Sequence, residues 1–298
     1  MKKINKPNLD SEDIFEKCVN SFRENSLFSK SQLLSMKQYI KLSHDEYERC
    51  GKFSQLHIFN ENNNLLSYIN VGDFEKLYTS GLSNSKKEKI YCFYKKIKSG
   101  FNELDNKCAF CGIGIVKELD HFLPKSKFKT LAIEPLNLLP ICGDCNREKN
   151  NYSFLDDDVG LVHPYFDDVC GVWLNIYFSI EKTEVIISDI KIENNGGVDI
   201  DLFKRIEKTI TELNIIELYK SYLTVDCRII RDVIKDSCSY DEALISIKYE
   251  INKNKKVMHE NHPRRRLYEC ALDYVFKPND FYKIKSILES KLIFFIKL

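Results

Sequence analysis

The sequence contains no long hydrophobic run. Hydrophobic residues make up 43% of the 298 positions, but no apolar stretch approaches the roughly 20 residues that a membrane-spanning helix needs. The first residues include lysines, but no apolar segment of a secretory signal follows them. We therefore expect a cytoplasmic protein without a membrane partner.

The sequence also lacks an excess of charge of one sign. It has 45 basic and 44 acidic residues, so no global field attracts it to nucleic acid. Trp173 is the one tryptophan, and the 16 tyrosines do not interleave with basic residues as in single-strand-binding proteins. Contacts to phosphate must therefore come from a local patch. This argues against a protein that coats nucleic acid and leaves room for an enzyme with a small contact surface.

The cysteines are too sparse for a disulfide scaffold. There are 11 in the chain, an odd number and a low density for its length. Seven have no recurring spacing, and we interpret them as small apolar core residues. These are Cys18, Cys50, Cys92, Cys170, Cys227, Cys238 and Cys270.

The other four cysteines form two CxxC pairs. Cys108 and Cys111 make the first pair and Cys142 and Cys145 the second. Four thiolates at this spacing can hold one zinc ion tetrahedrally and leave no coordination position open for water. Glycines 112 and 143 suit the tight turns of such pairs. We predict a structural zinc ion that does no chemistry.

The hydrophobic pattern predicts an α+β protein with largely helical N- and C-terminal regions. Helical stretches are predicted at residues 11–25, 30–42, 73–79, 85–97, 200–236, 240–252 and 281–296. Aromatic and β-branched residues alternate over 172–193, which predicts a β-hairpin with a turn near Glu181. We see no internal repeat. We expect three regions: a helical N-terminal region (residues 1–100), a module that contains the paired cysteines (101–170), and a β-hairpin followed by a helical C-terminal region (171–298).

Two short strands and a helix are predicted inside the cysteine segment. The first strand, 116–119, leads to Asp120 and His121, and the second, 137–141, leads to the second cysteine pair, after which a helix begins. A zinc ion that joins the two pairs would bring Asp120, His121 and Asn146 together. Asp and Asn supply the oxygen ligands that Mg²⁺ prefers.

This segment resembles the HNH endonucleases of the ββα-metal class, in the zinc-containing form also found in a phage junction-resolving endonuclease. The resemblance covers residues 108–149 and not the flanks. It depends on an ordered set of residues: Cys108, Cys111, Asp120, His121, Asn137, Cys142, Cys145 and Asn146. Asn146 stands where the family motif has its last His, a variation that many members share.

The resemblance implies a role for each residue between and beside the cysteines. His121 would be the general base that activates water, and Asp120 and Asn146 would bind one catalytic Mg²⁺ or Mn²⁺. Asn137 would bridge the loop between the strands and keep His121 aimed. The implied reaction is hydrolysis of DNA phosphodiester bonds to 5′-phosphate and 3′-hydroxyl ends. Taken singly, Asn137 could be a turn residue and Asn146 a helix cap.

The chain is also similar to HNH nuclease subunits of bacterial anti-phage defence systems, which implies a regulatory ATPase or another defence protein as partner. One alternative is an HNH nuclease that cleaves RNA, for example tRNA. Another is a zinc-stabilised adaptor with a vestigial site, against which the intact Asp120, His121 and Asn146 argue. The sequence separates neither DNA from RNA nor one oligomeric state from another.

Candidate phosphate contacts flank the predicted catalytic residues: Lys125, Lys127, Lys129, Arg147 and Lys149. The loop lysines could equally be solvated. A second basic run consists of 264–266, with Lys253, Lys255 and Lys256 upstream; we interpret it as a solvated helix start and as the next contact to test.

A second histidine stands after the cysteine segment. His163 is followed by Pro164 and by two acids, Asp167 and Asp168. We interpret this stretch as a turn that packs the module and not as a second metal site, because loop position and carboxylates alone are a weak signal.

Overall fold

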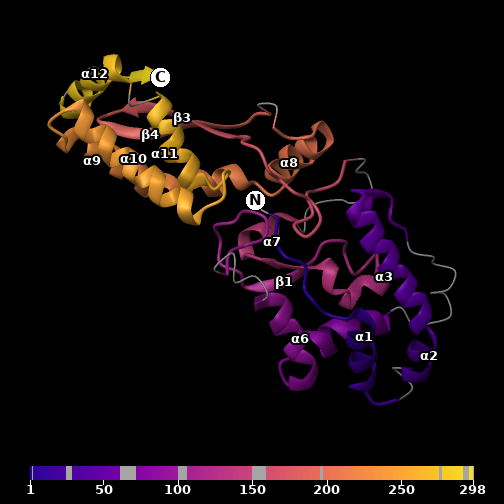
Figure 1. The fold of residues 1–298 in the computed structure, drawn as a ribbon. Coiled ribbons are helices and arrows are strands. Elements are labelled where there is room, and N and C mark those ends of the chain that lie inside the picture. Colours follow the sequence, from indigo (N-terminus) through magenta and orange to yellow (C-terminus); the bar gives the residue numbers. More distant parts are fainter. Residues whose placement is uncertain are drawn as a thin grey trace. The chain divides into compact units, whose positions relative to one another are not determined.

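The computed structural model of the protein describes residues 1, 3–24, 29–60, 72–99, 106–149, 159–194, 197–274, 277–290 and 295–297. The chain divides into an N-terminal unit (Lys3–Asp168) and a C-terminal unit (Val169–Leu298 with Met1–Lys2). Each combines helices with a small antiparallel sheet (Figure 1), so the α+β class is confirmed. No described helix has the length and apolar character needed to cross a membrane.

Helices form most of the N-terminal unit ahead of residue 100. They are α1 (Ser11–Asn20), α2 (Lys30–Ser35), α3 (Lys37–Lys52), α5 (Gly72–Lys76) and α6 (Glu88–Ser99), with the turns η1 (Leu56–Ile58) and η2 (Leu77–Leu82). The Asp10 side chain caps α1 by accepting from the backbone N–H of Glu12 and Asp13. The stretch predicted as one helix, 30–42, is two helices that meet at Met36, and the second continues to Lys52.

The cysteine segment contains the predicted order of strand, strand and helix. Strands β1 (Glu118–His121) and β2 (Leu138–Ile141) pair antiparallel, with Glu118 opposite Ile141 and His121 opposite Leu138. Two turns of 3₁₀ helix lie between them, η4 (Lys129–Ile133) and η5 (Pro135–Asn137). Helix α7 (Gly143–Lys149) follows β2 directly.

One hydrophobic core joins these strands to the N-terminal helices. It contains Leu119 and Leu138 from the strands together with Phe15, Phe74 and Ile97 from the helices. Side chains alternate along a strand, so Leu119 and His121 share the buried face of β1 while Glu118 and Asp120 share the other. The boundary expected near residue 100 therefore lies inside a single unit.

The C-terminal unit contains a three-stranded sheet in the order β4-β3-β5. Its strands are β3 (Leu174–Glu181), β4 (Glu184–Ile192) and β5 (Phe295–Lys297). The predicted hairpin is confirmed, and it turns at Lys182 and Thr183, whose φ angles of 49° and 68° suit a tight hairpin turn. The helix predicted over 281–296 is wrong at its end. Residues 295–297 pair with β3 instead, and 291–294 lie outside the described residues.

The helices of this unit are α8 (Ile200–Glu212), α9 (Ile215–Asp236), α10 (Tyr240–Val257), α11 (Pro263–Tyr274) and α12 (Pro278–Glu289). The stretch predicted as one helix, 200–236, is interrupted at Asn214, which adopts a left-handed conformation with φ 48°. A helical period continues across such a break, so the pattern alone does not reveal it.

The basic run at the start of α11 is not a solvated surface. Arg264 contacts Asp226 at 3.0 Å, Arg265 contacts Glu269 at 3.1 Å, and Arg266 contacts Glu269 at 2.7 Å. Arg266 also donates to the carbonyl oxygen of Leu174. These guanidinium groups hold the unit together, which corrects their interpretation as a solvated helix start.

The isolated cysteines divide by burial. Cys18, Cys50, Cys227 and Cys270 are buried, as predicted, and Cys92 is half-buried. Burial raises the pKa of Cys18 and of Cys227 to about 12, so both thiols stay protonated and unreactive. Cys170 and Cys238 are exposed, so their assignment to the core is wrong.

Candidate zinc centre and candidate active site

The four paired cysteines form one buried cluster. The sulfur atoms of Cys108, Cys111, Cys142 and Cys145 all lie within 4.8 Å of one another, and the cysteines are at most 3% exposed. Four thiolates around one point are the ligand set of a structural zinc ion, with Zn–S distances of about 2.3 Å. The donor set therefore fits the predicted zinc. No other cluster of His, Cys, Asp or Glu able to hold a metal is found in the described residues.

Local hydrogen bonds favour the thiolate form of Cys111 and Cys142. Backbone N–H groups of Gly114 and Cys145 donate to the sulfurs of Cys111 and Cys142, at 3.3 and 3.5 Å. The hydrogen bond from Cys108 is the main cause that lowers the pKa of Cys142, to about 7, and it also lowers the pKa of Cys111. Burial raises the pKa of Cys108, and hydrogen bonds with the other cysteines raise that of Cys145. Two of the four thiols thus favour the deprotonated form that metal ligation requires.

The glycines that matter here differ from those expected. Gly112 has φ 72°, as its turn requires. A Cβ atom at Gly143 would meet nothing within 4 Å, whereas one at Gly114 would lie 2.7 Å from the Cβ and Sγ atoms of Cys142. Gly114 is therefore the glycine at which a larger residue would disturb the cluster. The sequence pattern pointed to Gly112 and Gly143 instead.

The Asn137 side chain makes every hydrogen bond available to an amide. Its oxygen accepts from the backbone N–H of Leu123 at 2.8 Å and from the Tyr47 hydroxyl at 3.0 Å. Its nitrogen donates to the carbonyl oxygens of Leu123 and Leu131, at 3.0 and 3.2 Å. Asn137 is fully buried. It thus ties both ends of the segment between β1 and β2, which is the bridging role that the resemblance implies.

His163 supports Asn137 through Tyr47. The backbone N–H of Tyr165 donates to Nδ1 of His163 at 3.2 Å, so the proton of the neutral ring is on Nε2, which lies 3.1 Å from the Tyr47 hydroxyl. The carboxylate of Asp167 accepts from the His163 backbone N–H at 2.7 Å. The predicted turn is present, and it supports the candidate active site.

Successive carbonyl groups of η4 accept hydrogen bonds from three side chains. The oxygen of Thr130 accepts from Nε2 of His44 at 2.9 Å, that of Leu131 from Asn137, and that of Ala132 from Nε2 of His121 at 2.8 Å. A carbonyl oxygen only accepts, so each of these nitrogens carries a proton. Helix α3, which contains His44, thus helps to position the turn that orients His121.

His121 is a neutral imidazole with a defined tautomer. Burial is the main cause that lowers its pKa to about 4, and the charges of Lys125 and Lys149 contribute to this shift. Because Nε2 donates to Ala132, the lone pair is on Nδ1, which makes no hydrogen bond to the described residues. The ring packs edge-on against Tyr78, with centroids 4.4 Å apart. This arrangement suits a group that accepts a proton at Nδ1.

Asp120 is paired with Lys149. The Lys149 ammonium lies 2.8 Å from Oδ2 of Asp120 and 2.6 Å from the carbonyl oxygen of His121. Lys149 is only 6% exposed, and its role as a phosphate contact stays a prediction. It places a positive charge at the end of β1, and it leaves Oδ1 of Asp120 without a partner among the described residues.

Asn146 lies on α7 and contacts Glu118. Its nitrogen donates to the Glu118 carboxylate at 2.8 Å, which fixes the amide orientation, since a carboxylate only accepts. Its Oδ1 atom is buried and accepts no hydrogen bond from the described residues. A buried oxygen without a hydrogen-bond partner fits the hard oxygen ligands that Mg²⁺ and Mn²⁺ prefer. Glu118 was missed, although it precedes Asp120 by two positions and so shares its strand face.

The remaining predicted phosphate contacts have different surroundings. Lys129 forms an ion pair with Glu75 at 2.6 Å, and Arg147 forms one with Asp144 at 2.7 Å. Lys127 is exposed and Lys125 is half-buried, with its ammonium 5.6 Å from the centre of the Tyr78 ring. Lys125 and Lys127 therefore form no ion pair among the described residues, and the charge of Lys125 acts on His121, while the charge of Lys129 is neutralised.

The close approach at Gly114 yields a stability and zinc prediction. Gly114→Ala is expected to cost about 1–3 kcal/mol, because its new methyl group overpacks against Cys142, and to lower bound zinc below one per chain. Gly143→Ala is the matched control and is expected to bind zinc as the wild type does. Zinc stoichiometry and thermal unfolding measure both effects. Normal zinc content and stability in both Gly114→Ala and Cys142→Ser would disprove the shared ion.

The Asn137 hydrogen bonds yield a second stability prediction. Asn137→Asp keeps the size but leaves the oxygens of Leu123 and Leu131 without a donor, and it should cost on the order of 3 kcal/mol or more. Tyr47→Phe removes one donor and should cost about 1–2 kcal/mol. Urea unfolding followed by circular dichroism measures both. Equal costs for the two variants would contradict the central role of Asn137.

The pKa of His121 predicts a pH dependence of stability. The ring takes up its proton near pH 4 when folded and near pH 6.5 when unfolded. Between these values the unfolded chain binds more protons, so this contribution makes stability rise with pH and is lost as pH falls toward 4. His121→Gln should show a smaller slope in this window, without added Mg²⁺. The pKa of His44 is raised, so His44 changes the pH dependence of stability only above pH 6.5. An unchanged slope in His121→Gln would refute the assignment.

Comparison with known proteins yields one informative relative. The chain is 38% identical over 96 residues to Protein ea31 of Escherichia phage lambda, a match that covers 31% of this chain and 31% of that protein. The match thus spans about a third of the length of that relative. No family model matches the chain. No solved structure matches it either.

Proposed function

We propose that this protein is a metal-dependent endonuclease of the HNH type that hydrolyses phosphodiester bonds in DNA. The observation that carries the proposal is the state of His121. Its ring is neutral, its Nε2 proton is held by Ala132, and its Nδ1 lone pair has no partner among the described residues. A histidine held in this way, next to Asp120 at the end of a zinc-clasped hairpin, is equipped to take a proton from water.

His121 supplies the general base, and its hydrogen bond to the Ala132 carbonyl orients the ring. Nδ1 takes the proton of the attacking water, and the Ala132 carbonyl stabilises the imidazolium that results. The low pKa keeps the ring ready at neutral pH but makes it a weak base. A phosphodiester anion next to the ring raises that pKa, because it favours the charged form. Substrate binding therefore strengthens the base.

Asp120 and Asn146 are the residues that would hold a divalent metal ion. Their oxygens Oδ1 are the atoms without hydrogen-bond partners in the described residues. Bound Mg²⁺ or Mn²⁺ would neutralise the phosphate and stabilise the departing 3′ oxygen. The zinc cluster has no part in this chemistry, because four thiolates leave no open position.

We further propose that the protein acts in bacterial anti-phage defence, in the cytoplasm, with a regulatory ATPase or another defence protein as partner. The support for this setting is the resemblance of residues 108–149 to nuclease subunits of such systems. The C-terminal unit, a compact body separate from the candidate active site, is the part that we assign to that partner.

A cleavage assay with a matched histidine control tests the proposed function. Supercoiled plasmid is incubated with Mg²⁺, with Mn²⁺ or with EDTA, and nicked and linear products are measured. Wild type should cleave with either metal. His121→Gln should lose activity by about 10²-fold or more, because Gln keeps a donor for Ala132 but has no basic nitrogen. His57→Gln, at an exposed histidine of the same unit, should cleave as the wild type does.

The outcomes separate the alternatives. Full cleavage by His121→Gln would sink the mechanism. Cleavage of structured RNA but not of plasmid would assign the protein to the RNA-cleaving alternative. Absence of cleavage of either substrate, with zinc bound and the protein folded, would favour the adaptor.

A further inference from the structure

A group of lysines without acidic partners in the described residues lies on and just before α6 and on either side of the first cysteine pair. We call it the α6 surface, and it consists of Lys86, Lys87, Lys89, Lys95, Lys96, Lys98, Lys107 and Lys117. Within the described part of the chain, none of these lysines forms an ion pair with an acid. Lys86, Lys89, Lys95, Lys96 and Lys117 are exposed. Glu88 is the one acid between residues 85 and 99.

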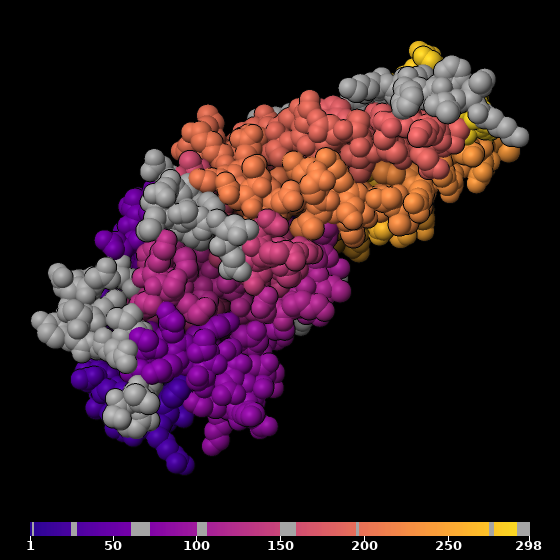
Figure 2. Space-filling model, turned by 180° about the vertical axis from the view of Figure 1, so that it is seen from behind, coloured from indigo at the N-terminus to yellow at the C-terminus, as the bar shows by residue number. Residues whose placement is uncertain are grey.

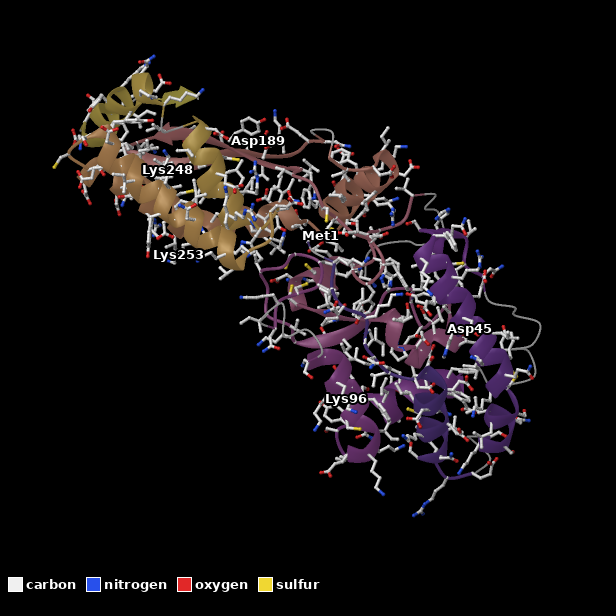
Figure 3. The ribbon with its side chains drawn as sticks, viewed as in Figure 1. Met1, Asp45, Lys96, Asp189, Lys248 and Lys253 are labelled. Carbon is white, nitrogen blue, oxygen red and sulfur yellow. The ribbon has the colours of Figure 1, made fainter. Side chains whose placement is uncertain are left out.

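Several lysines elsewhere in the same unit do have acidic partners. Lys37 lies 3.0 Å from Glu16, Lys41 3.2 Å from Glu12 and Lys52 3.1 Å from Glu48. Figure 3 shows Lys96 on α6 and Asp45 on α3 well apart on this unit. These acidic side chains on α1 and α3 are thus neutralised by lysines of α3, whereas the lysines of α6 have no acidic partner among the described residues.

The α6 surface is continuous with the candidate active site. The Lys98 ammonium donates to the carbonyl oxygen of Lys117, and the Tyr94 hydroxyl accepts from the backbone N–H of Leu119 at 3.2 Å. Lys117 directly precedes β1, so it lies about 10 Å along the strand from Asp120. In the space-filling view, the purple stretch that includes α6 forms part of the surface of the unit (Figure 2).

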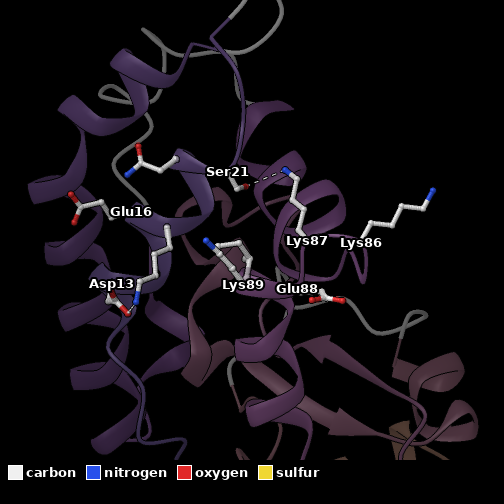
Figure 4. A pocket seen from close by; sticks show the side chains of 10 residues that line it. Asp13, Glu16, Ser21, Lys86, Lys87, Glu88 and Lys89 are labelled. Carbon is white, nitrogen blue, oxygen red and sulfur yellow. Dashed lines mark hydrogen bonds and ion pairs between the residues drawn. The ribbon is translucent and has the colours of Figure 1, made fainter.

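The surface ends in a cavity between α1 and the start of α6. Its volume is about 780 Å³, and it is lined by Lys86 and Lys87 just before α6 and by Glu88 and Lys89 on α6. The acids that line it from α1 are already paired, Asp13 with Lys17 and Glu16 with Lys37. Figure 4 shows Lys87 directed to Ser21, with which it forms a hydrogen bond of 3.1 Å, and Lys86 pointing away from α1. The cavity thus adds to the positive excess.

The extent of this surface matches a polyanion better than a small anion. A helix of 12 residues is about 18 Å long, which corresponds to roughly five base pairs of duplex. Lysines act as point charges without a fixed donor geometry, so they suit a phosphate backbone more than the edges of bases. The surface should therefore hold a duplex without regard to its sequence.

We propose that the α6 surface binds the phosphate backbone of duplex DNA and leads it to the hairpin that carries Asp120 and His121. This inference rests on the proposed function, because it supplies the surface on which that substrate lies. We therefore place the extended DNA contact on the α6 surface and not on the α11 arginines, whose charges are paired within their own unit.

The test measures binding without cleavage. The Kd for a duplex oligonucleotide is measured by fluorescence anisotropy over a range of salt concentrations, without divalent metal. The variant Lys95→Gln/Lys96→Gln/Lys117→Gln should lower the slope of log K against log salt by about 0.9 for each lost phosphate contact. Its Kd should rise on the order of tenfold at fixed salt. These lysines donate no hydrogen bond to the described protein, so the fold should be kept, which circular dichroism checks.

The control changes the net charge by the same amount elsewhere in the unit. Lys37→Gln/Lys41→Gln/Lys52→Gln removes lysines that are already paired with acids and should bind as the wild type does. Equal weakening in both triple variants, or in neither, would overturn the assignment. Tighter binding of an RNA duplex that the α6 variant loses would overturn the choice of DNA.

Parallel cleavage assays separate this inference from the proposed function. If wild type cleaves plasmid and the α6 variant binds and cleaves normally, the surface is wrong and the nuclease stands. If the α6 variant alone loses binding but wild type never cleaves, the surface stands and the nuclease fails.

Discussion

The hydrogen bonds of the Asn137 amide are the constraint on which the candidate active site depends. This one side chain joins the residues after β1, the carbonyl of Leu131 in η4 and the Tyr47 hydroxyl on α3. Each of these groups is buried, so leaving one unpaired would cost about 1–3 kcal/mol. The position of η4, and with it the Ala132 carbonyl that orients His121, follows from satisfying all of them together.

Two clamps hold opposite ends of the short hairpin. The cysteine cluster closes the end where Glu118 pairs with Ile141, and Asn137 closes the end where His121 pairs with Leu138. A two-stranded hairpin of this length is marginal by itself in water. A cysteine cluster that fits a zinc ion and an amide with all its hydrogen bonds made therefore replace the strand length that would otherwise fix the register. A one-residue slip would move Asp120 and His121 to each other's face.

Much of this arrangement follows from local sequence, and the rest does not. The zinc cysteines, the strand-strand-helix order and the bridging Asn137 were predictable, because each depends on spacing within about 40 residues. The neutralisation of Lys129 by Glu75 was not, because the partners lie 54 positions apart. The same holds for Arg264 and Asp226, 38 positions apart. The burial of Lys149 was not predictable either, since the sequence at the end of a helix does not show which basic side chain turns inward.

Local charge pairing also explains how a chain with a net charge of +1 can present a basic surface. An ion pair removes one charge of each sign from the surface, so the pairs of α3 and α11 leave little field behind them. The lysines of α6 keep theirs, because none of them forms an ion pair among the described residues and Glu88 is the one acid within the helix. At 0.1 M salt a charge is screened beyond about 10 Å, so acids on distant helices do not cancel this field. What an approaching polyanion meets is the local excess on α6, and the net charge of the chain does not report it.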